Sequence, residues 1–201
     1  TDVDFGYDGS LYVSDWVNGW NGLGKGRIYQ FTDTKHAGEA KQVHSAELMI
    51  EGFSERSTEE LVGLLAHPDQ RIRMEAQFAL VNRSALDSLQ NVALNGKDLF
   101  ARLHAIWGIG QLGRQTSSAV AGIQRLLKDQ DSEVRAQTAK VIGEAGFTSA
   151  TPPLIELLKD SNARVQYFAA VALGHFKSQA AVPALFELLK QNNNADPMLR
   201  H

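Results

Sequence analysis

The chain has 201 residues, of which 43% are hydrophobic and 21% charged, and its formal net charge at pH 7 is -3. This composition is typical of a folded protein, and the near-neutral charge argues against a nucleic-acid-binding surface, which needs a basic excess. The absence of cysteine excludes disulfides, thiolate metal sites, cysteine nucleophiles and covalent haem attachment within the chain. No apolar run reaches the roughly 20 residues of a membrane span.

Residues 1–31 have the pattern of a short β-meander. Polar and apolar residues alternate over Asp2–Phe5, and two further strand-like runs follow at Ser10–Ser14 and Arg27–Phe31. The Asp-Gly pair at residues 8–9 supplies a turn between the first two runs. Three strands this short bury little apolar surface, so we expect them to pack on another element or to belong to a larger sheet.

Residues 32–56 form a connector. Within it, residues 45–53 predict a short helix that ends at Gly52, because glycine commonly follows the last turn of a helix. The composition changes again at Ser57, where a repeating pattern begins.

Residues 57–201 repeat a helix, a short turn and a second helix, and repeats of this kind decide the fold. We expect helix pairs near residues 57–81, 86–112, 117–145 and 150–176, and a further first helix near 181–191 in an incomplete last repeat. An arginine or glutamine recurs in the second helix at spacings of 29, 33, 31 and 34 residues. These recurring residues are Arg73, Arg102, Arg135, Gln166 and Arg200.

An aspartate or asparagine stands four residues before each of these positions. Its side chain can accept hydrogen bonds from the free amides of a first helical turn, so we interpret these residues as N-caps. A ligand-binding ladder is the alternative, but recurrence at the same position of every unit favours the structural role. Gly110, Gly143 and Gly174 predict close helix contacts and left-handed exits from the second helices. The caps are Asp69, Asp98, Asp131, Asn162 and Asp196.

The segment LLKDQDSEVRAQTA at residues 126–139, and the run LLKD at 157–160, resemble the HEAT-repeat family in its short bacterial form. This resemblance extends over residues 57–201. It implies an all-α fold, a right-handed α-α superhelix of armadillo-like type, preceded here by the β-meander. The fold hosts many unrelated functions, so the resemblance names no partner.

The segments DGSLYVSDW at residues 8–16 and GKGRIY at 24–29 resemble the last blade of a sugar-dehydrogenase-like β-propeller. Some large bacterial proteins classed as membrane-bound dehydrogenases join such a propeller to HEAT repeats and a cytochrome c. The resemblance implies a periplasmic or exported fragment of a larger oxidoreductase. The remaining blades and the haem-attachment motif are absent from this sequence, so any redox activity would reside elsewhere in such a parent.

Five side chains are candidates for contacts with a ligand or partner. In the propellers that the first residues resemble, an acidic residue ending a strand faces the central channel, which singles out Asp15, with Trp16 and Trp20 close by. The alternative is that both tryptophans cover apolar surface. Trp107 and Tyr167 fall on second helices, which line the concave face of solenoids. We expect most aromatics there to be core and one or two to be exposed anchors for a partner.

No catalytic, metal or cofactor site is predicted. None of the six histidines forms a His-x-x-x-His or His-Glu-x-x-His pair. The glycine run at residues 22–26 opens a strand, not a helix, so it is not a dinucleotide-binding fingerprint. We therefore expect no enzyme activity within this chain.

Two functions remain from the sequence: a protein-binding scaffold that uses the concave surface of the solenoid, or the docking arm of a propeller-containing oxidoreductase. A nucleic-acid partner is disfavoured by the acidic balance. The chain starts without methionine and stops five residues after Asp196, so we expect an excerpt. We also expect self-association through its C-terminal end, where the last long helix carries Val182, Leu185, Phe186, Leu188 and Leu189.

Overall fold

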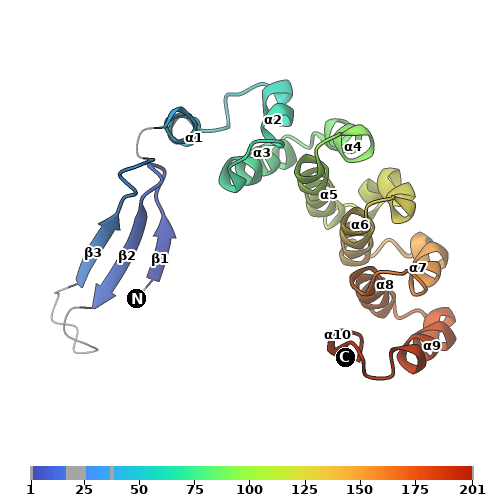
Figure 1. Cartoon of the computed structure of the whole chain (residues 1–201). Coiled ribbons are helices and arrows are strands. Elements are labelled where there is room, and N and C mark those ends of the chain that lie inside the picture. Colours follow the sequence, from blue (N-terminus) through green and yellow to red (C-terminus); the bar gives the residue numbers. More distant parts are fainter. Residues whose placement is uncertain (1, 17–25, 37–38, 201) are drawn as a thin grey trace. The chain divides into compact units, whose positions relative to one another are not determined.

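The computed structural model describes residues 2–16, 26–36 and 39–200, and for Trp16 and residues 40–42 it describes the backbone only. The chain divides into two compact units, residues 1–55 and 56–201 (Figure 1). Among the described residues, none of the helices is both long and apolar enough to cross a membrane.

In its described residues, the first unit contains a three-stranded antiparallel sheet and one helix. β1 (Asp2–Phe5), β2 (Leu11–Trp16) and β3 (Gly26–Phe31) pair in the order β1-β2-β3, which confirms the predicted meander. The helix α1 (Ala40–Glu51) begins five residues earlier than the sequence predicted and ends at Gly52, whose φ is 78°.

The turn between β1 and β2 depends on Asp8 and Gly9. Gly9 has φ of 75°, a left-handed conformation that costs glycine little. The Asp8 carboxylate accepts hydrogen bonds from the Ser10 amide at 3.0 Å and from the Tyr12 hydroxyl at 3.0 Å. These bonds fix the register in which Asp4 faces Tyr12 across the hairpin.

The second unit is the predicted row of helix pairs. Short 3₁₀ turns at Thr148–Ala150 and Gln179–Ala181 precede α7 and α9. The first helices are α2 (Thr58–Leu64), α4 (Leu86–Asn95), the 3₁₀ helix η2 (Ser117–Lys128), α7 (Thr151–Leu157) and α9 (Val182–Asn192). The second helices are α3 (Gln70–Asn82), α5 (Leu99–Gly113), α6 (Ser132–Glu144), α8 (Ala163–His175) and the short α10 (Pro197–Arg200).

Local sequence explains where these helices begin. At α2, the Ser57 side chain accepts from the Glu60 amide at 3.2 Å and the Glu60 carboxylate accepts from the Ser57 amide at 2.7 Å, a capping box. Prolines stand in the first turns of α7 and α9, where the missing amide proton costs no helical bond.

The helix pairs stack into an α-α solenoid in which each pair contacts its neighbours. Within the second unit, the second helices form the inner row of an arc and the first helices form the outer row (Figure 1). Along the inner row, α3 packs on α5, α5 on α6 and α6 on α8. The core lies between the rows and is made of fully buried aliphatic side chains from both, such as Leu61, Leu89, Ile106, Ile142 and Leu154. Each such side chain contributes about 1.5–3 kcal/mol by leaving water.

The predicted left-handed exit at Gly143 is wrong, because this residue lies inside α6. The left-handed residue is Gly146, with φ of 66°, and Ser84 and Lys177 adopt the same conformation after α3 and α8. Gly143 instead permits close packing, since a Cβ atom there would lie 2.7 Å from the Ala172 Cα atom in α8.

Gly110 and Gly174 also lie inside their helices rather than at left-handed exits. A Cβ atom at Gly110 would lie 2.8 Å from the Val141 Cβ atom in α6. Around Gly174, no described atom lies within 4 Å of such a Cβ position. Glycine therefore permits a close approach of the neighbouring helix at residues 110 and 143, but not at residue 174.

Candidate functional site

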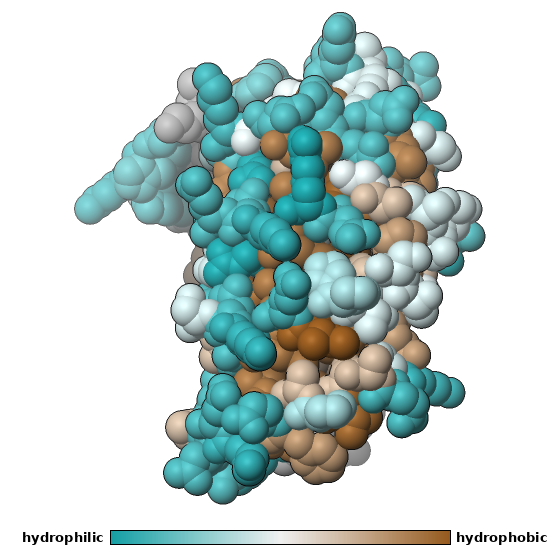
Figure 2. All heavy atoms as spheres, turned by 90° about the vertical axis from the view of Figure 1, so that its right-hand side faces the viewer, coloured by the Kyte–Doolittle hydropathy of each residue, from teal (hydrophilic) through white to brown (hydrophobic). Residues whose placement is uncertain are grey.

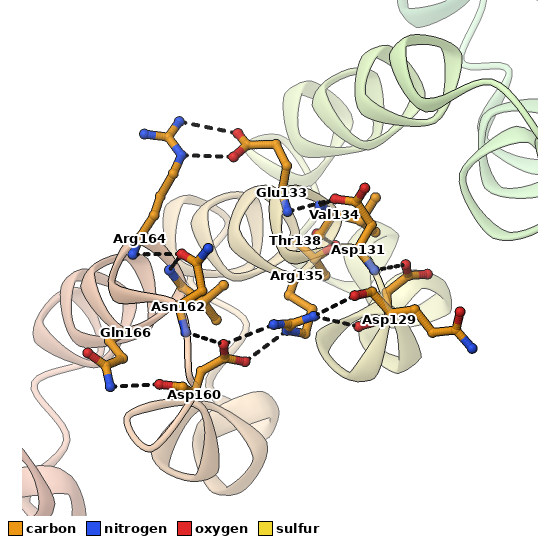
Figure 3. A network of polar contacts seen from close by, with 12 residues as sticks. Asp129, Asp131, Glu133, Val134, Arg135, Thr138, Asp160, Asn162, Arg164 and Gln166 are labelled. Carbon is orange, nitrogen blue, oxygen red and sulfur yellow. Dashed lines mark hydrogen bonds and ion pairs between the residues drawn. The ribbon is translucent and has the colours of Figure 1, made fainter.

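Each of the five predicted cap residues accepts a hydrogen bond from a backbone amide in the first turn of a second helix. At α6, the Asp131 Oδ1 atom accepts from the Glu133 amide at 2.8 Å and the Val134 amide at 3.2 Å (Figure 3). The equivalent bonds at the other helices come from Asp69, Asp98, Asn162 and Asp196.

Two of the recurring arginines join successive repeats along the edge formed by these turns. Arg102 in α5 pairs with Asp129 before α6, with Nη2 and Oδ2 2.5 Å apart. Arg135 in α6 pairs with Asp160 before α8, with Nε and Oδ2 2.8 Å apart (Figure 3). In both pairs the carboxylate binds a neighbouring repeat, which supports the structural interpretation of the ladder over a ligand-binding one.

A hollow of about 280 Å³ opens on the inner row between α3, α5 and α6. We call this the inner hollow. Apolar groups come from Met74 and Phe78 of α3 and from Trp107 of α5. Its polar residues are Gln70 and Gln77 of α3, His104, Gln111 and Arg114 of α5, and Lys140 and Glu144 of α6.

A chain of polar contacts connects residues that line the inner hollow. The Gln77 amide donates to Gln111 Oε1 at 3.3 Å, and its own Oε1 lies 2.8 Å from His104 Nδ1. The His104 ring meets Trp107 edge to face, with centroids 4.9 Å apart. The Trp107 indole then donates to Gln137 Oε1 at 2.8 Å. These bonds hold the indole in one orientation between α5 and α6.

His104 serves this chain as a neutral group. Its side chain is buried, and burial, assisted by the nearby charge of Arg73, lowers the pKa of His104 from its ordinary value of 6.5 to about 4. At neutral pH the imidazole is therefore uncharged, and Nδ1 donates to the Gln77 carbonyl oxygen that faces it.

The walls of the inner face carry charges of both signs. Arg114 binds Glu144 at 2.8 Å, and Lys140 lies 3.8 Å from the same carboxylate. Farther along, Glu133 of α6 binds Arg164 of α8 at 2.9 Å (Figure 3). The inner face thus presents aromatic and methionine side chains beside paired, exposed ions.

The predicted contact residues come from both units. Asp15 lies in β2 opposite Arg27 of β3, in the first unit. Trp16 ends β2, where only its backbone is described, and Trp20 lies outside the described residues. Of the two on second helices, Trp107 lines the inner hollow. Tyr167 lies on α8 with its ring 5.2 Å from that of Phe168.

The sequence interpretation missed most residues of the inner hollow. Met74 and Phe78 are four residues apart on α3, and His104, Gln111 and Arg114 recur at intervals of seven and three on α5, so helical spacing was the available signal. Across residues 2–16, 26–36 and 39–200, no group of three or more His, Asp or Glu side chains is placed to hold a metal ion.

The exposed large apolar side chains of the described repeats belong to two pairs of helices. One group is Met74, Phe78, Leu99 and Phe100, on α3 and α5. The other is Val182, Phe186, Leu189 and Met198, on α9 and α10. Figure 2 shows the outer face, where hydrophilic side chains predominate and hydrophobic ones become more frequent towards the end at which α7 and α9 lie in Figure 1.

Comparison with known proteins supports the repeat assignment. Residues 120–197 match the family of HEAT repeats. The complex of CpcE and CpcF of phycocyanin lyase from Nostoc sp. PCC7120 contains a chain with a similar structure, with a TM-score of 0.56 and 21% identity. The match covers 73% of this chain and 62% of the lyase chain, so this chain spans less than two thirds of that relative. An engineered protein is similar at a TM-score of 0.45 and 21% identity, over 71% of this chain and 74% of that one. A search of curated proteins finds no match.

The structure and these comparisons together show the fold, a HEAT-like solenoid preceded by a small sheet. The family match lies within the helical repeats and does not include residues 1–31. The β-propeller resemblance therefore stays a prediction from the sequence.

Proposed function

We propose that this chain is a non-catalytic protein-binding scaffold that uses the inner face of its HEAT-like solenoid. The inner hollow carries the proposal, because it combines partly exposed Met74 and Phe78 with an indole that hydrogen bonds hold in place. Large apolar groups beside polar ones are typical of protein interfaces, and methionine adapts to varied partner surfaces.

The charges of the inner face favour a protein partner over a nucleic acid. Nucleic-acid-binding faces carry an excess of lysine and arginine that tracks the phosphates. Here Arg114 and Arg164 are each paired with a glutamate. The solved relative is itself a complex of two proteins, and association with another protein is the property we carry over from it.

The same contacts favour binding over catalysis. A general acid or base works best with a pKa near the operating pH. The pKa of His104 is about 4, and its Nδ1 atom is engaged by Gln77. The match covers only 62% of the phycocyanin lyase chain, so we do not extend the lyase activity to this chain.

A capture experiment tests the scaffold. The double change Met74→Ser and Phe78→Ser removes two partly exposed apolar side chains from the inner hollow, and Arg125→Ala on the exposed side of η2 is the matched outer-face control. We expect a protein retained from an extract of the native host by the wild type and by Arg125→Ala to be lost with the double variant. In the retained complex, α3 and α5 should gain protection from hydrogen exchange. Equal retention by all three chains, or protection confined to outer helices, would refute an inner binding face.

The docking-arm alternative concerns a longer parent protein and rests on the resemblance of residues 8–16 and 24–29. Neither the HEAT-repeat match nor the similar lyase chain favours it, so we propose the scaffold alone.

A further inference from the structure

At two joints an arginine binds an aspartate of the next repeat, and Arg135 also binds the turn of its own repeat. Its Nη1 atom donates to the carbonyl oxygens of Asp129 and Gln130 in the turn of its own repeat, at 2.8 and 3.0 Å. Its Nε and Nη2 atoms donate to the two carboxylate oxygens of Asp160 in the next repeat, at 2.8 and 2.9 Å. One edge of the guanidinium group thus binds the turn of its own repeat, and the other edge binds the next repeat.

The carboxylate belongs to the residue that stands two positions before the N-cap of the second helix in the next repeat. Asp129 and Asp160 hold this position before α6 and α8. Before α10 the position is Asn194, which has no charge, and the recurring residue that precedes it is Gln166 instead of arginine. The recurring residue is thus an arginine where the next repeat supplies an aspartate, as at Arg102 and Arg135. It is a glutamine, Gln166, where the next repeat supplies an asparagine.

Arg73 breaks this correspondence. Its Nη1 atom donates to the His67 and Pro68 carbonyl oxygens at 2.7 and 2.9 Å, as Arg135 does in its own turn. The position before α5 that would supply the carboxylate is Gly96. Arg73 is only 8% exposed, and its Nε atom is a buried polar atom for which the described residues provide no hydrogen-bond partner.

The Phe100 ring covers Arg73 in place of a carboxylate, with its centroid 4.8 Å from the guanidinium carbon. A ring face attracts the charge but does not accept the in-plane hydrogen bonds that a carboxylate takes from the fork. Phe100 is 56% exposed, so the ring can turn towards solvent without leaving a packed core. The chain cannot simply place a side chain at Gly96, because a Cβ atom there would lie 2.5 Å from the Val92 carbonyl oxygen.

We propose that the unpaired side of Arg73 binds a carboxylate from an aspartate or glutamate of a protein partner, which displaces the Phe100 ring. Partner binding at this turn edge would complete the same bidentate contact that Asp160 makes with Arg135. The contact lies outside the inner hollow, so it can hold even if the proposed function of the inner face fails.

Nuclear magnetic resonance of the full ¹⁵N-labelled chain tests the proposal directly. Sodium acetate, titrated against sodium chloride at equal ionic strength, is the small-carboxylate probe. We expect the Nε–Hε resonance of Arg73 to shift and saturate with acetate but not with chloride. The matching resonances of Arg102 and Arg135 should stay fixed, because Arg102 Nε already donates to the Ala93 carbonyl oxygen and Arg135 Nε to the Asp160 carboxylate. A fixed Arg73 resonance, or equal drift of all three, would overturn the proposal.

Two short peptides that differ only in a central Asp or Asn distinguish a partner carboxylate from a free one. We expect the Asp peptide to bind more tightly than acetate and the Asn peptide not to shift Arg73. Equal affinity for acetate and the Asp peptide would overturn the assignment to a protein partner.

Variants test the role of the ring. Phe100→Ala should tighten binding of the Asp peptide roughly tenfold, because the site no longer has to open. Phe186→Ala, which alters another exposed phenylalanine, on α9, should leave the affinity unchanged. Arg73→Lys keeps the charge but lacks the fork, so it should weaken binding. An unchanged or weaker affinity in Phe100→Ala would overturn the displacement. The wild-type titration decides the main point even if Arg73→Lys does not fold.

Discussion

Arg135 binds both carboxylate oxygens of Asp160 across the boundary between two repeats, and the two side chains are only 14% and 9% exposed. Burial alone would raise the pKa of Asp160, but hydrogen bonds from Arg135 and from the Asn162 amide outweigh it and hold that pKa below its ordinary value. The pair therefore remains ionised at neutral pH. Because each repeat of a solenoid contacts only its neighbours, a single joint of this kind affects the stability of the whole row.

Asp160→Asn should lower the free energy of unfolding by about 3 kcal/mol, because it leaves a largely buried guanidinium without its counter-charge. The asparagine oxygen can still accept from the Asn162 amide, so the loss reports the ion pair. Urea denaturation measures it. Glu156→Gln is the control, since its contact with Lys128 at 3.5 Å is exposed and should be worth less than about 1 kcal/mol. Equal losses in the two variants would contradict the assignment.

Gly143→Ala and Gly174→Ala should change stability in opposite directions. Both residues are helical, where alanine is favoured over glycine by roughly 0.5–1 kcal/mol. At Gly143 the new methyl group meets Ala172 of α8, and overpacking of this kind costs about 1–3 kcal/mol. At Gly174 the space is open. Thermal melts should therefore place the first variant below the wild type and the second at or above it. The same sign for both would show that helix propensity, not the α6–α8 contact, decides.

Asp131→Ala should cost about 1 kcal/mol, the usual effect of removing an N-cap. Its Oδ1 atom accepts from two first-turn amides of α6. Gln130→Ala, at the exposed neighbouring position, is the control and should have almost no effect. A melting temperature of Asp131→Ala equal to that of the control would remove the capping role.

The helix pairs could be predicted from sequence because their boundaries depend on local chemistry. Asp131 and Asn162 precede α6 and α8 directly, so the caps gave the starts of these helices. Left-handed exits were harder to place. Ser84 and Lys177 adopt positive φ in the same place as Gly146, although nothing in their side chains favours it.

The inner hollow could be predicted only in part. Trp107 was expected on a second helix, but Gln77 and Lys140 reach the same hollow from repeats on either side of it. Which residues meet there depends on how neighbouring second helices are aligned when they stack. The periodicity of a single helix does not give that alignment. Likewise, the unpaired side of Arg73 becomes visible only when its joint is compared with that of Arg135 in three dimensions.

We expect the chain to self-associate through α9. Val182, Phe186 and Leu189 follow one another at intervals of four and three, on one side of the helix, and all three are exposed. Phe186→Glu should reduce the concentration-dependent increase in sedimentation coefficient, because a charge in the contact must be desolvated. Gln191→Glu adds the same charge to α9 without removing an apolar group. A wild-type chain that stays monomeric at high concentration would refute the expectation.

His104 should make the fold less stable as the pH falls from 6.5 to about 4. The unfolded chain binds a proton near the ordinary value of 6.5, whereas the folded chain, in which this side chain is 4% exposed, binds it only near pH 4. The unfolded state thus holds more protons in this window, so the contribution to stability is full above 6.5 and is lost as the pH falls through the folded pKa. At 1.36 kcal/mol for each unit of pKa difference between the two states, the loss approaches about 3 kcal/mol.

His104→Asn keeps a donor towards Gln77 but does not titrate. The difference in unfolding free energy between wild type and variant, measured by urea denaturation at several pH values, should therefore change across this window and be constant above pH 7. The other histidines are common to both chains and cancel in this difference. A difference that does not vary with pH would show that the buried imidazole is not held neutral by the fold.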